Sequence, residues 1–442
     1  KMSQDAIGEL IELCRQSGGA DFTIGDVFFK ETEDSGFGIF TNSKIDKLNS
    51  VVVSVPFRSC ISVDLITKSP PLDLIFIENP GYLSYPDEVI SIGLIFARLR
   101  LQKTDQNISC PWSRHVRTMP ETFNTTLFWS ENELDELKGC TVFHLTKLLK
   151  RQIESDYQAL YEPLISNYPE YFSSMTINDY YWALSVVYSR SAEIIRQGTL
   201  VQCIPPIVDM ANHNPQLSVE PSEALYYDEV TDSIQLRTAQ ILNPQEECTA
   251  VYGNYPNSKL LYTYGFVIHD NPHKAIDLWT KVTPTVYQAE VKQQILLNHR
   301  LTAVQTYDFV GTIRNGFISS ALLATIRVIQ AIEDEMKDIE KAFKGEMISI
   351  RNEKATYTSL RNLLISRMNP EKAEDDRLKL GEMLLSDVST SDRLYCALVI
   401  KVEERELLQS VLELVNQWME SLDSLGDSFK PIDFVESSLV EL

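Results

Sequence analysis

Two segments decide the fold: PPIVDMANHNP at residues 205–215 and VYGNYPNSKLLYTYGFV at residues 251–267. In the first segment an apolar run ends in Asp209, Asn212 and His213, and in the second an apolar run ends in a cluster of tyrosines. Buried polar groups are costly unless they are hydrogen-bonded. Two such clusters therefore predict one dry pocket with a few placed donors, which is the usual form of a small-molecule site.

Each segment alone also has an ordinary interpretation. Asn-His-Asn-Pro at 212–215 could form an Asx turn, and a tyrosine-rich strand end is commonly part of a core. Together, Asp-x-x-Asn-His at 209–213, Tyr-Gly-x-x-x-Asn at 252–257 and Tyr-Gly-Phe at 264–266 resemble the SET-domain protein methyltransferases. The resemblance is to the Rubisco large-subunit methyltransferase-like branch, which includes fungal lysine methyltransferases of ribosomal proteins and elongation factors. It extends through most of the chain.

The resemblance implies an α+β fold, with a β-rich SET core, a helical insertion and an all-helical C-terminal substrate-binding domain. We expect an N-terminal helix at 1–20, a SET domain at 21–275 with the insertion at about 85–195, and the helical domain at 276–442. The length of 442 residues agrees with this organisation, because it exceeds a single ordinary core. In this branch the C-terminal domain docks protein substrates; a domain that only packs is the alternative.

Hydrophobic periodicity and capping residues predict the individual elements. An amphipathic helix is expected at 4–17, ended by the two glycines that follow it, and a second helix is expected at 87–102. Capping boxes at Ser130 and Thr176 open two more helices. The expected short strands lie near 27–29, 37–40 and 50–56, and two further long helices are expected at 319–343 and from 393 to about 419.

The resemblance also assigns roles to site residues. Tyr252 would be the catalytic tyrosine at the reacting methyl group, Tyr264 the second channel tyrosine and Phe266 the aromatic ring that packs on the cofactor. The cofactor would be S-adenosylmethionine, bound by Ser35, Gly36, Phe37, Ser189, Arg190, Asp209, Asn212, His213, Tyr252 and Phe266. The substrate channel would be lined by Arg190, Asp209, Tyr252 and Tyr264, with Asp209 placed to bond near the amine or to brace the tyrosine.

The glycines of the turn Gly36-Phe37-Gly38 would let the backbone pass close to a flat or charged group. A simple hairpin turn is the other interpretation of this loop. The chain departs from the family pattern at Lys259, where an acidic residue is common, and in a spacing from Tyr252 to Tyr264 that is about one residue shorter. Both departures leave the register at Asn257 open.

The net charge of −22 and the pI near 4.7 argue against nucleic acid as a direct ligand. This acidity favours a basic protein surface, such as a ribosomal protein or a lysine-rich tail, as the partner. An acidic surface that only confers solubility is the other interpretation. No apolar run is long enough to span a membrane, and Glu9, Glu12 and Arg15 interrupt the apolar positions near the N-terminus, so no signal peptide is expected.

The seven cysteines are widely spaced, form no Cys-x-x-Cys pair and are odd in number. A reducing compartment, cytoplasmic or nuclear or both, is therefore expected instead of a disulfide framework. His269 and His273 are four residues apart, but Pro272 lies between them and no His-Glu pair is present, so we expect surface histidines and no metal. The chain is expected to act as a monomer.

These observations lead to one functional hypothesis with two alternatives. The main hypothesis is a protein-lysine N-methyltransferase that uses S-adenosylmethionine and acts on a non-histone protein, such as a ribosomal protein or a translation factor. The first alternative is a protein-histidine methyltransferase of the same fold, because few channel residues separate the two nucleophiles. The second is a catalytically silent SET module that binds a partner protein; Tyr252 and the pair Asn212-His213 argue against it.

Overall fold

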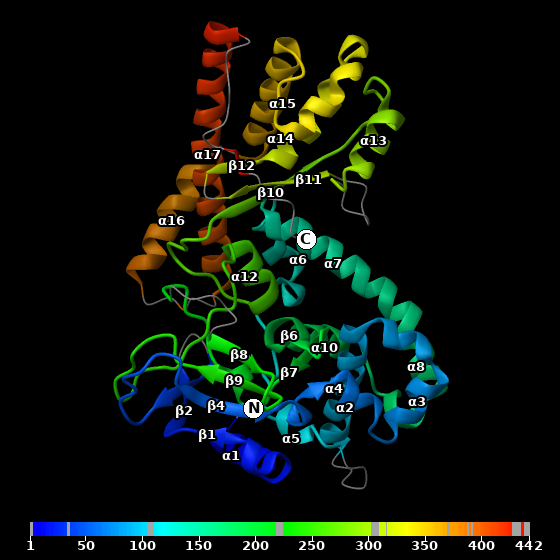
Figure 1. The fold of residues 1–442 in the computed structure, drawn as a ribbon, viewed down its shortest axis with the longest axis vertical. Coiled ribbons are helices and arrows are strands. Elements are labelled where there is room, and N and C mark those ends of the chain that lie inside the picture. The colour runs from blue at the N-terminus through cyan, green and yellow to red at the C-terminus, as the bar shows by residue number, and fades with distance from the viewer. Residues whose placement is uncertain are drawn as a thin grey trace. The chain divides into compact units, whose positions relative to one another are not determined.

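The computed structural model describes residues 3–32, 36–103, 110–217, 224–301, 309–314, 316–368, 372–386, 389, 392–426 and 435–436. The chain forms two compact units. The first unit consists of Lys1–Ser130, Thr146–Tyr255 and Lys259–Phe266. The second unit consists of Glu131–Leu145, Pro256–Ser258 and Val267–Leu442. The predicted α+β class is confirmed, since both units combine helices with sheets (Figure 1).

Three small antiparallel sheets make up the β-rich part of the first unit. The largest has the order β1-β4-β9-β8, and its strands are Thr23–Ile24, Val51–Pro56, Ser233–Arg237 and Leu225–Asp228. The hairpin consists of β2 (Val27–Thr32) and β3 (Gly36–Thr41). The third sheet has the order β5-β7-β6, with strands Ile61–Ser62, Thr199–Ile204 and Ala192–Arg196. The strands expected at the N-terminal end are therefore present.

The helices of the first unit begin with α1, Gln4–Gly18, whose N-terminus is capped by the hydroxyl of Ser3 and which ends at Gly19, as predicted. The capping box of Thr176 and Asp179 is also confirmed, and it opens α10. The remaining helices lie mostly in the predicted insertion: α2 (Val63–Thr67), α3 (Leu72–Glu78), α4 (Pro86–Lys103), α5 (Ser113–Val116), α8 (Glu162–Asn167), α9 (Pro169–Phe172) and α10 (Ile177–Arg190). Helix α7 (Thr141–Asp156) and helix α12 (Asn257–Tyr264) each have residues in both units.

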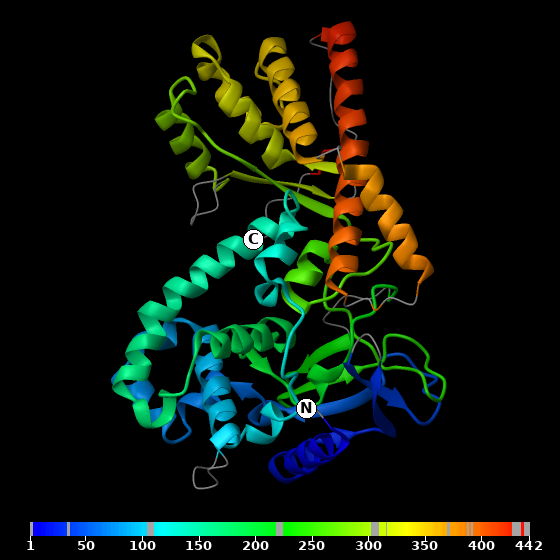
Figure 2. The ribbon, with the colours of Figure 1, turned by 180° about the vertical axis from the view of Figure 1, so that it is seen from behind.

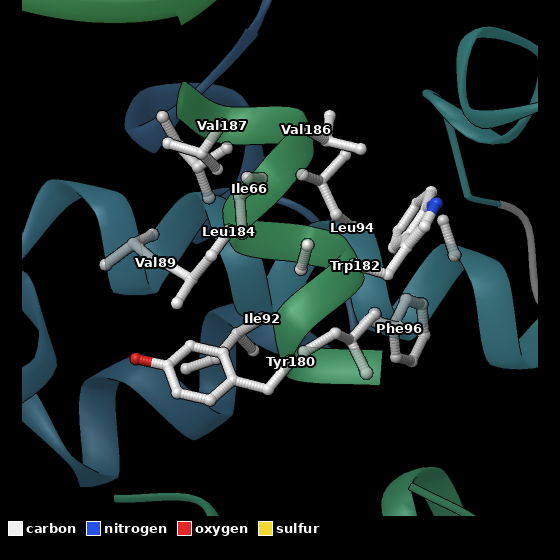
Figure 3. Packing of buried hydrophobic residues seen from close by; sticks show 14 of the residues in the cluster. Ile66, Val89, Ile92, Leu94, Phe96, Tyr180, Trp182, Leu184, Val186 and Val187 are labelled. Atoms are coloured by element: carbon white, nitrogen blue, oxygen red, sulfur yellow. The ribbon is translucent and has the colours of Figure 1, made fainter. Parts of the chain in front are cut away.

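The core of this helical part forms where α4 and α10 lie side by side (Figure 3). Leu94 and Phe96 of α4 pack near Trp182 of α10, and all three are buried. Branched and aromatic side chains on one stripe of each helix exclude water from the contact, which is the main source of its stability. This packing fixes the C-terminal end of α10, and Arg190 is the last residue of that helix.

The second unit contains a sheet as well as helices. Strands β10 (Ala275–Thr280), β11 (Phe309–Arg314), β12 (Phe317–Ser319) and β13 (Val435–Glu436) pair in that order. The expectation of an all-helical C-terminal domain omitted this sheet. In β10 only Ile276 and Leu278 alternate into the core, which is too short a pattern to distinguish from a loop.

Helices α14 (Ser320–Gln330), α15 (Ile350–Met368) and the C-terminal half of α17 (Arg393–Leu425) stand side by side on this sheet (Figure 2). The other helices of the second unit are α6 (Glu131–Asp135), α13 (Ala289–Asn298) and α16 (Ala373–Leu385). Within the described residues, no helix combines the length and the apolar character that a membrane crossing requires.

The prediction of one continuous helix at 319–343 is wrong. Helix α14 stops at Gln330, and the 3-10 helix η7 (Glu333–Lys344) follows. Between them Ala331 and Ile332 are extended, with ψ of 139° and 178°.

A buried lysine explains this break. The ammonium group of Lys292 donates hydrogen bonds to the carbonyl oxygens of Ile329 at 2.9 Å and Ala331 at 2.6 Å. Carbonyl groups at the C-terminal end of a helix have no intrahelical donor, and Lys292 supplies one here. The Glu335 carboxylate accepts a hydrogen bond from the backbone N–H of Ile332 and so starts the next turn. The apolar periodicity of residues 319–343 continues through the break, and Lys292 comes from another helix, so the pattern alone does not reveal where α14 ends.

Two adjacent carboxyl groups on α17 predict a pH-dependent stability. Glu404 accepts a hydrogen bond from the backbone N–H of Thr141 at 3.0 Å, and Glu403 accepts one from Nδ2 of Asn257 at 2.9 Å. Burial raises the pKa of each carboxyl to about 7. The folded chain therefore retains protons that the unfolded chain loses near pH 4.5.

The free energy of unfolding should consequently fall as the pH rises from about 4.5 to about 7, by about 1–3 kcal/mol per carboxyl, and then level off. Urea unfolding at a series of pH values measures this slope. Replacing both residues, Glu403→Gln with Glu404→Gln, should flatten it, apart from the part due to Glu88 and Glu247, whose raised pKa values have the same sign. Glu413→Gln, which alters an exposed carboxyl on the same helix, should leave the slope as it is. An unchanged slope in the double variant would contradict the assignment.

Candidate active site

The two segments that decide the fold lie side by side, as predicted. His213 and Ala250 form a parallel bridge. The backbone N–H of Ala250 donates to the carbonyl of Asn212 at 2.8 Å, and that of Asn214 donates to the carbonyl of Ala250 at 2.9 Å. This pairing places the residue after the second apolar run, Tyr252, next to the Asn-His corner of the first.

The chain enters this corner through a strained turn. Ile207 is buried and has φ of 70° and ψ of −48°, and the backbone N–H of Val208 bonds to the carbonyl of Pro206 at 2.8 Å. This is a γ-turn, which is costly for a β-branched residue. It turns the chain out of β7 and into the 3-10 helix η6 (Val208–Met210), which carries Asp209.

Tyr252 is held at both ends. Its hydroxyl donates a hydrogen bond to the carbonyl of Ala211 at 2.9 Å, and its backbone N–H donates to Nδ1 of His213 at 3.2 Å. The rings of Tyr252 and His213 lie 5.1 Å apart. Burial raises the pKa of the Tyr252 phenol to about 12, although the nearby Arg190 lowers it. At neutral pH the phenol keeps its proton, so the hydroxyl is a fixed dipole at the site.

Aromatic rings form a wall around Tyr252. The ring of Tyr264 lies 4.7 Å from it, and the rings of Tyr255 and Phe266 lie 6.3 Å and 6.2 Å from Tyr264. Gly253 is required here, because a Cβ at this position would collide with the ring of Tyr255. Burial raises the pKa of Tyr264 well above its usual range, so this phenol is also neutral. The predicted channel residues Tyr252 and Tyr264 are thus neighbours.

Asp209 makes contacts that differ from those expected. Its fully buried Oδ2 lies 2.9 Å from Nη1 of Arg190 and 3.2 Å from Nε2 of His115. Burial would raise the pKa of the Asp209 carboxyl, but the imidazole and the guanidinium lower it below its usual range. The carboxylate therefore holds Arg190 through a hydrogen bond and lies close to His115, whereas the hydroxyl of Tyr252 is braced by the carbonyl of Ala211.

Asn212 is held against the β2–β3 hairpin. Its Nδ2 donates to Oε1 of Glu247 at 2.7 Å, and burial raises the pKa of that carboxyl. A Cβ at Gly38 would collide with the Glu247 carboxylate and approach Nδ2 of Asn212. Gly38 therefore allows the hairpin to pass close to Asn212, which agrees with the close approach predicted for this turn.

The structure places the other predicted residues as follows. Ser35 lies outside the described residues. Gly36 and Phe37 begin β3, and Phe37 packs on the core of the β-rich part. The hydroxyl of Ser189 donates to the carbonyl of Ser185 within α10 at 2.6 Å. His115 and Glu247 were missed, because a single histidine or glutamate carries no pattern; burial, visible only in the fold, singles them out.

Asn257 closes the segment that carries two of the aromatic rings. Its side chain exchanges two hydrogen bonds of 2.8 Å with the backbone N–H and carbonyl of Ile268, and it is fully buried. The chain between these two residues includes Tyr264 and Phe266. Asn257 thus supports the ends of this segment.

An exposed turn at Gln245 leads to Glu247 and offers a stability test. Gln245 has φ of 71°, and its backbone N–H donates to the carbonyl of Thr41 at 2.7 Å. We expect Gln245→Gly to raise the free energy of unfolding by about 0.5–1 kcal/mol, because the left-handed conformation costs a side-chain-bearing residue more than glycine loses in chain entropy. Gln245→Ala is the matched control and should not raise the thermal unfolding temperature. An equal rise for both variants would show that Gln245 is not strained.

Comparison with known proteins agrees with this arrangement. The sequence profile described as Rubisco LSMT substrate-binding matches residues 283–408. An Arabidopsis thaliana chloroplastic [fructose-bisphosphate aldolase]-lysine N-methyltransferase is 24% identical over 405 residues, covering 88% of this chain and 79% of the relative. An actin-histidine N-methyltransferase of Xenopus tropicalis is 24% identical, covering 98% of this chain and 74% of the relative.

A ribosomal lysine N-methyltransferase of Schizosaccharomyces pombe is also 24% identical, covering 74% of this chain and 58% of the relative. The solved structure of Rubisco LSMT bound to AdoMet superposes with a TM-score of 0.75 at 20% identity, covering 95% of this chain and 93% of that one. The resemblance carried by the sequence motifs is confirmed: the chain has the SET fold of Rubisco large-subunit methyltransferase and is a relative of the SET-type protein methyltransferases.

Proposed function

We propose that the chain is an S-adenosylmethionine-dependent protein-lysine N-methyltransferase that acts on a non-histone protein, such as a ribosomal protein or a translation factor. The observation that carries this proposal is the hydroxyl of Tyr252, fixed on the carbonyl of Ala211 inside an aromatic wall and beside Asn212 and His213. Relatives along most of the chain methylate lysine in other proteins by name.

The residues present suit the cofactor. Arg190 offers a guanidinium to a carboxylate, and Asn212 offers an amide that Glu247 orients beside the hairpin backbone at Gly38. Among the described residues, no metal-binding group of three or more histidine, cysteine or acidic side chains is present, and methyl transfer needs none. When bound, S-adenosylmethionine supplies a sulfonium methyl group to a nitrogen lone pair.

The chain's own residues have two tasks in this reaction. A lysine ammonium has a pKa near 10.4, and a channel of aromatic rings disfavours its charged form, so Tyr252, Tyr255 and Tyr264 favour the neutral amine. The fixed hydroxyl of Tyr252 can then orient the nitrogen. Alignment of reacting groups supplies about 7–11 kcal/mol in the best intramolecular cases.

The protein substrate is proposed to be basic, because the chain carries a net charge of −22. Residues 276–442 would dock it, with residues 21–275 as the SET domain, and the chain would act as a monomer. None of the seven cysteines, which all lie in the described part of the chain, forms a disulfide, and this suits a reducing cytosol or nucleus. The second candidate is protein-histidine methylation, which the Xenopus tropicalis relative favours. A silent SET module would bind a partner without transfer.

The test combines binding with transfer. Calorimetry with S-adenosylhomocysteine checks the cofactor site, and labelled methyl transfer to fractionated cell extract, followed by mass spectrometry, identifies the modified residue. We expect binding and a methylated lysine in a basic protein. Methylated histidine would replace the main proposal with the second candidate, binding without transfer would support the silent module, and an absence of binding would end all three.

A further inference from the structure

His115 lies buried behind the candidate site. It belongs to the short helix α5, and its side chain is 3% exposed. Its Nε2 lies 3.2 Å from Oδ2 of Asp209, whose side chain is 0% exposed. Burial of an imidazole beside a carboxylate costs free energy unless both groups are hydrogen-bonded.

The same oxygen of Asp209 has a second partner. Arg190 donates through Nη1 to Oδ2 of Asp209 at 2.9 Å and to its carbonyl at 3.1 Å. The contact with His115 is close but poorly aligned for a hydrogen bond: within the described part of the chain, both ring nitrogens of His115 and Oδ1 of Asp209 lack a hydrogen-bond partner. Arg190 thus makes the hydrogen bonds to Asp209, and His115 lies next to the same carboxylate without making one.

Exposure separates the roles of the two partners. The Arg190 side chain is 15% exposed, whereas His115 and Asp209 are sealed from solvent. Only Arg190 can therefore reach a ligand. Both bonds to Asp209 come from Nη1. A rotation of the guanidinium that turns its fork toward an anionic ligand weakens them, and the buried carboxylate then needs another donor.

We infer that His115 is a positioning residue. It donates a hydrogen bond to the Asp209 carboxylate when Arg190 binds the carboxylate of the methionine part of S-adenosylmethionine. The inference rests on the proposed function and deepens it. Asp209 belongs to η6, which ends directly before Ala211. The carbonyl of Ala211 braces the Tyr252 hydroxyl. Holding Asp209 in place therefore keeps the phenol in place while Arg190 moves.

A role limited to filling space is the alternative, and it predicts a different result. If His115 only packs, phenylalanine, a somewhat larger flat ring without a donor, should serve as well as glutamine. If His115 supplies a donor, His115→Gln should serve better, because its amide nitrogen falls near the position of Nε2. His115→Asn places its nitrogen near Nδ1 instead and cannot reach Oδ2.

The experiment measures the Kd of S-adenosylhomocysteine by calorimetry and the Tm of each ligand-free variant. We expect His115→Phe and His115→Asn to weaken binding roughly tenfold or more, a change of about 1.4 kcal/mol. His115→Gln should stay within about threefold of the unmodified protein, since an amide donor replaces the imidazole donor. His299→Gln, which alters a histidine–carboxylate pair of 3.7 Å in the second unit, is the matched control and should change nothing.

A double variant gives a second measurement. With Asp209→Asn in place, His115→Asn should weaken binding no further, because the carboxylate that it serves is gone. If His115→Phe does not fold, the comparison of His115→Asn with His115→Gln decides the matter. If His115→Phe or His115→Asn binds S-adenosylhomocysteine as tightly as His115→Gln, the inference is wrong and the proposed function is unaffected. If the unmodified protein does not bind S-adenosylhomocysteine, the proposed function itself is wrong.

Discussion

Tyr252→Phe is expected to reduce methyl transfer roughly 10²- to 10³-fold, the size of effect seen when one placed hydrogen-bonding group is removed from an active site. The substitution deletes the hydroxyl that the carbonyl of Ala211 holds at 2.9 Å and leaves the ring in its stack with His213 and Tyr264. The aromatic wall that favours a neutral amine is therefore retained, and only the orienting oxygen is lost. Initial rates of labelled methyl transfer, together with the Kd of S-adenosylhomocysteine, measure the effect.

The expected signature is a loss in rate with nearly unchanged ligand affinity. Because the variant also leaves the buried carbonyl of Ala211 without its donor, a loss of about 1–3 kcal/mol in stability can accompany it. Tyr82→Phe is the matched control: the hydroxyl of Tyr82 also donates to a backbone carbonyl, that of Leu160 at 2.6 Å, but beside the core formed by α4 and α10. It should lose stability and keep transfer. A Tyr252→Phe variant that transfers as fast as Tyr82→Phe would remove Tyr252 from catalysis.

The sequence could predict that segments 205–215 and 251–267 lie side by side, because each segment carries a recognisable pattern. Asp209 to His213 ends one apolar run and Tyr252 follows another, and the structure joins them through the bridge of His213 and Ala250. What no pattern could supply is which polar groups face one another. Asp209 was expected to bond near the amine or to brace Tyr252. The brace comes from the carbonyl of Ala211 instead, and Asp209 faces Arg190 and also His115, which reaches it only through the packing of α5.

The helix ends illustrate the same limit. Helix α1 was predicted well because Ser3 and Gly19, which cap it, adjoin it in the chain. The end of α14 was missed because Lys292, the residue that binds its last carbonyls, comes from another helix. Local signals thus place an element, while contacts between distant residues decide where it stops.

The largest effect on stability is expected from Arg327→Met in the second unit. Arg327 on α14 and Glu353 on α15 are both buried and share two hydrogen bonds of 2.6 Å and 2.8 Å, and the hydroxyl of Tyr357 donates to the same carboxylate at 2.5 Å. Removing the guanidinium leaves a carboxylate without its counter-charge in a dry core. We expect the free energy of unfolding to fall by about 3–5 kcal/mol.

Replacing both members of the pair shows whether the lost stability comes from the unpaired Glu353 charge or from lost packing. Arg327→Met combined with Glu353→Leu removes both charges and keeps apolar volume, so it should be clearly more stable than Arg327→Met alone, because replacing a whole buried pair is often neutral or stabilising. The difference between the single and double variants is the coupling energy of the pair. Since the two units need not unfold together, hydrogen exchange of the amides in α14 and α15 is the measurement. If the double variant loses as much protection as Arg327→Met, the cost lies in packing, and the charge argument fails.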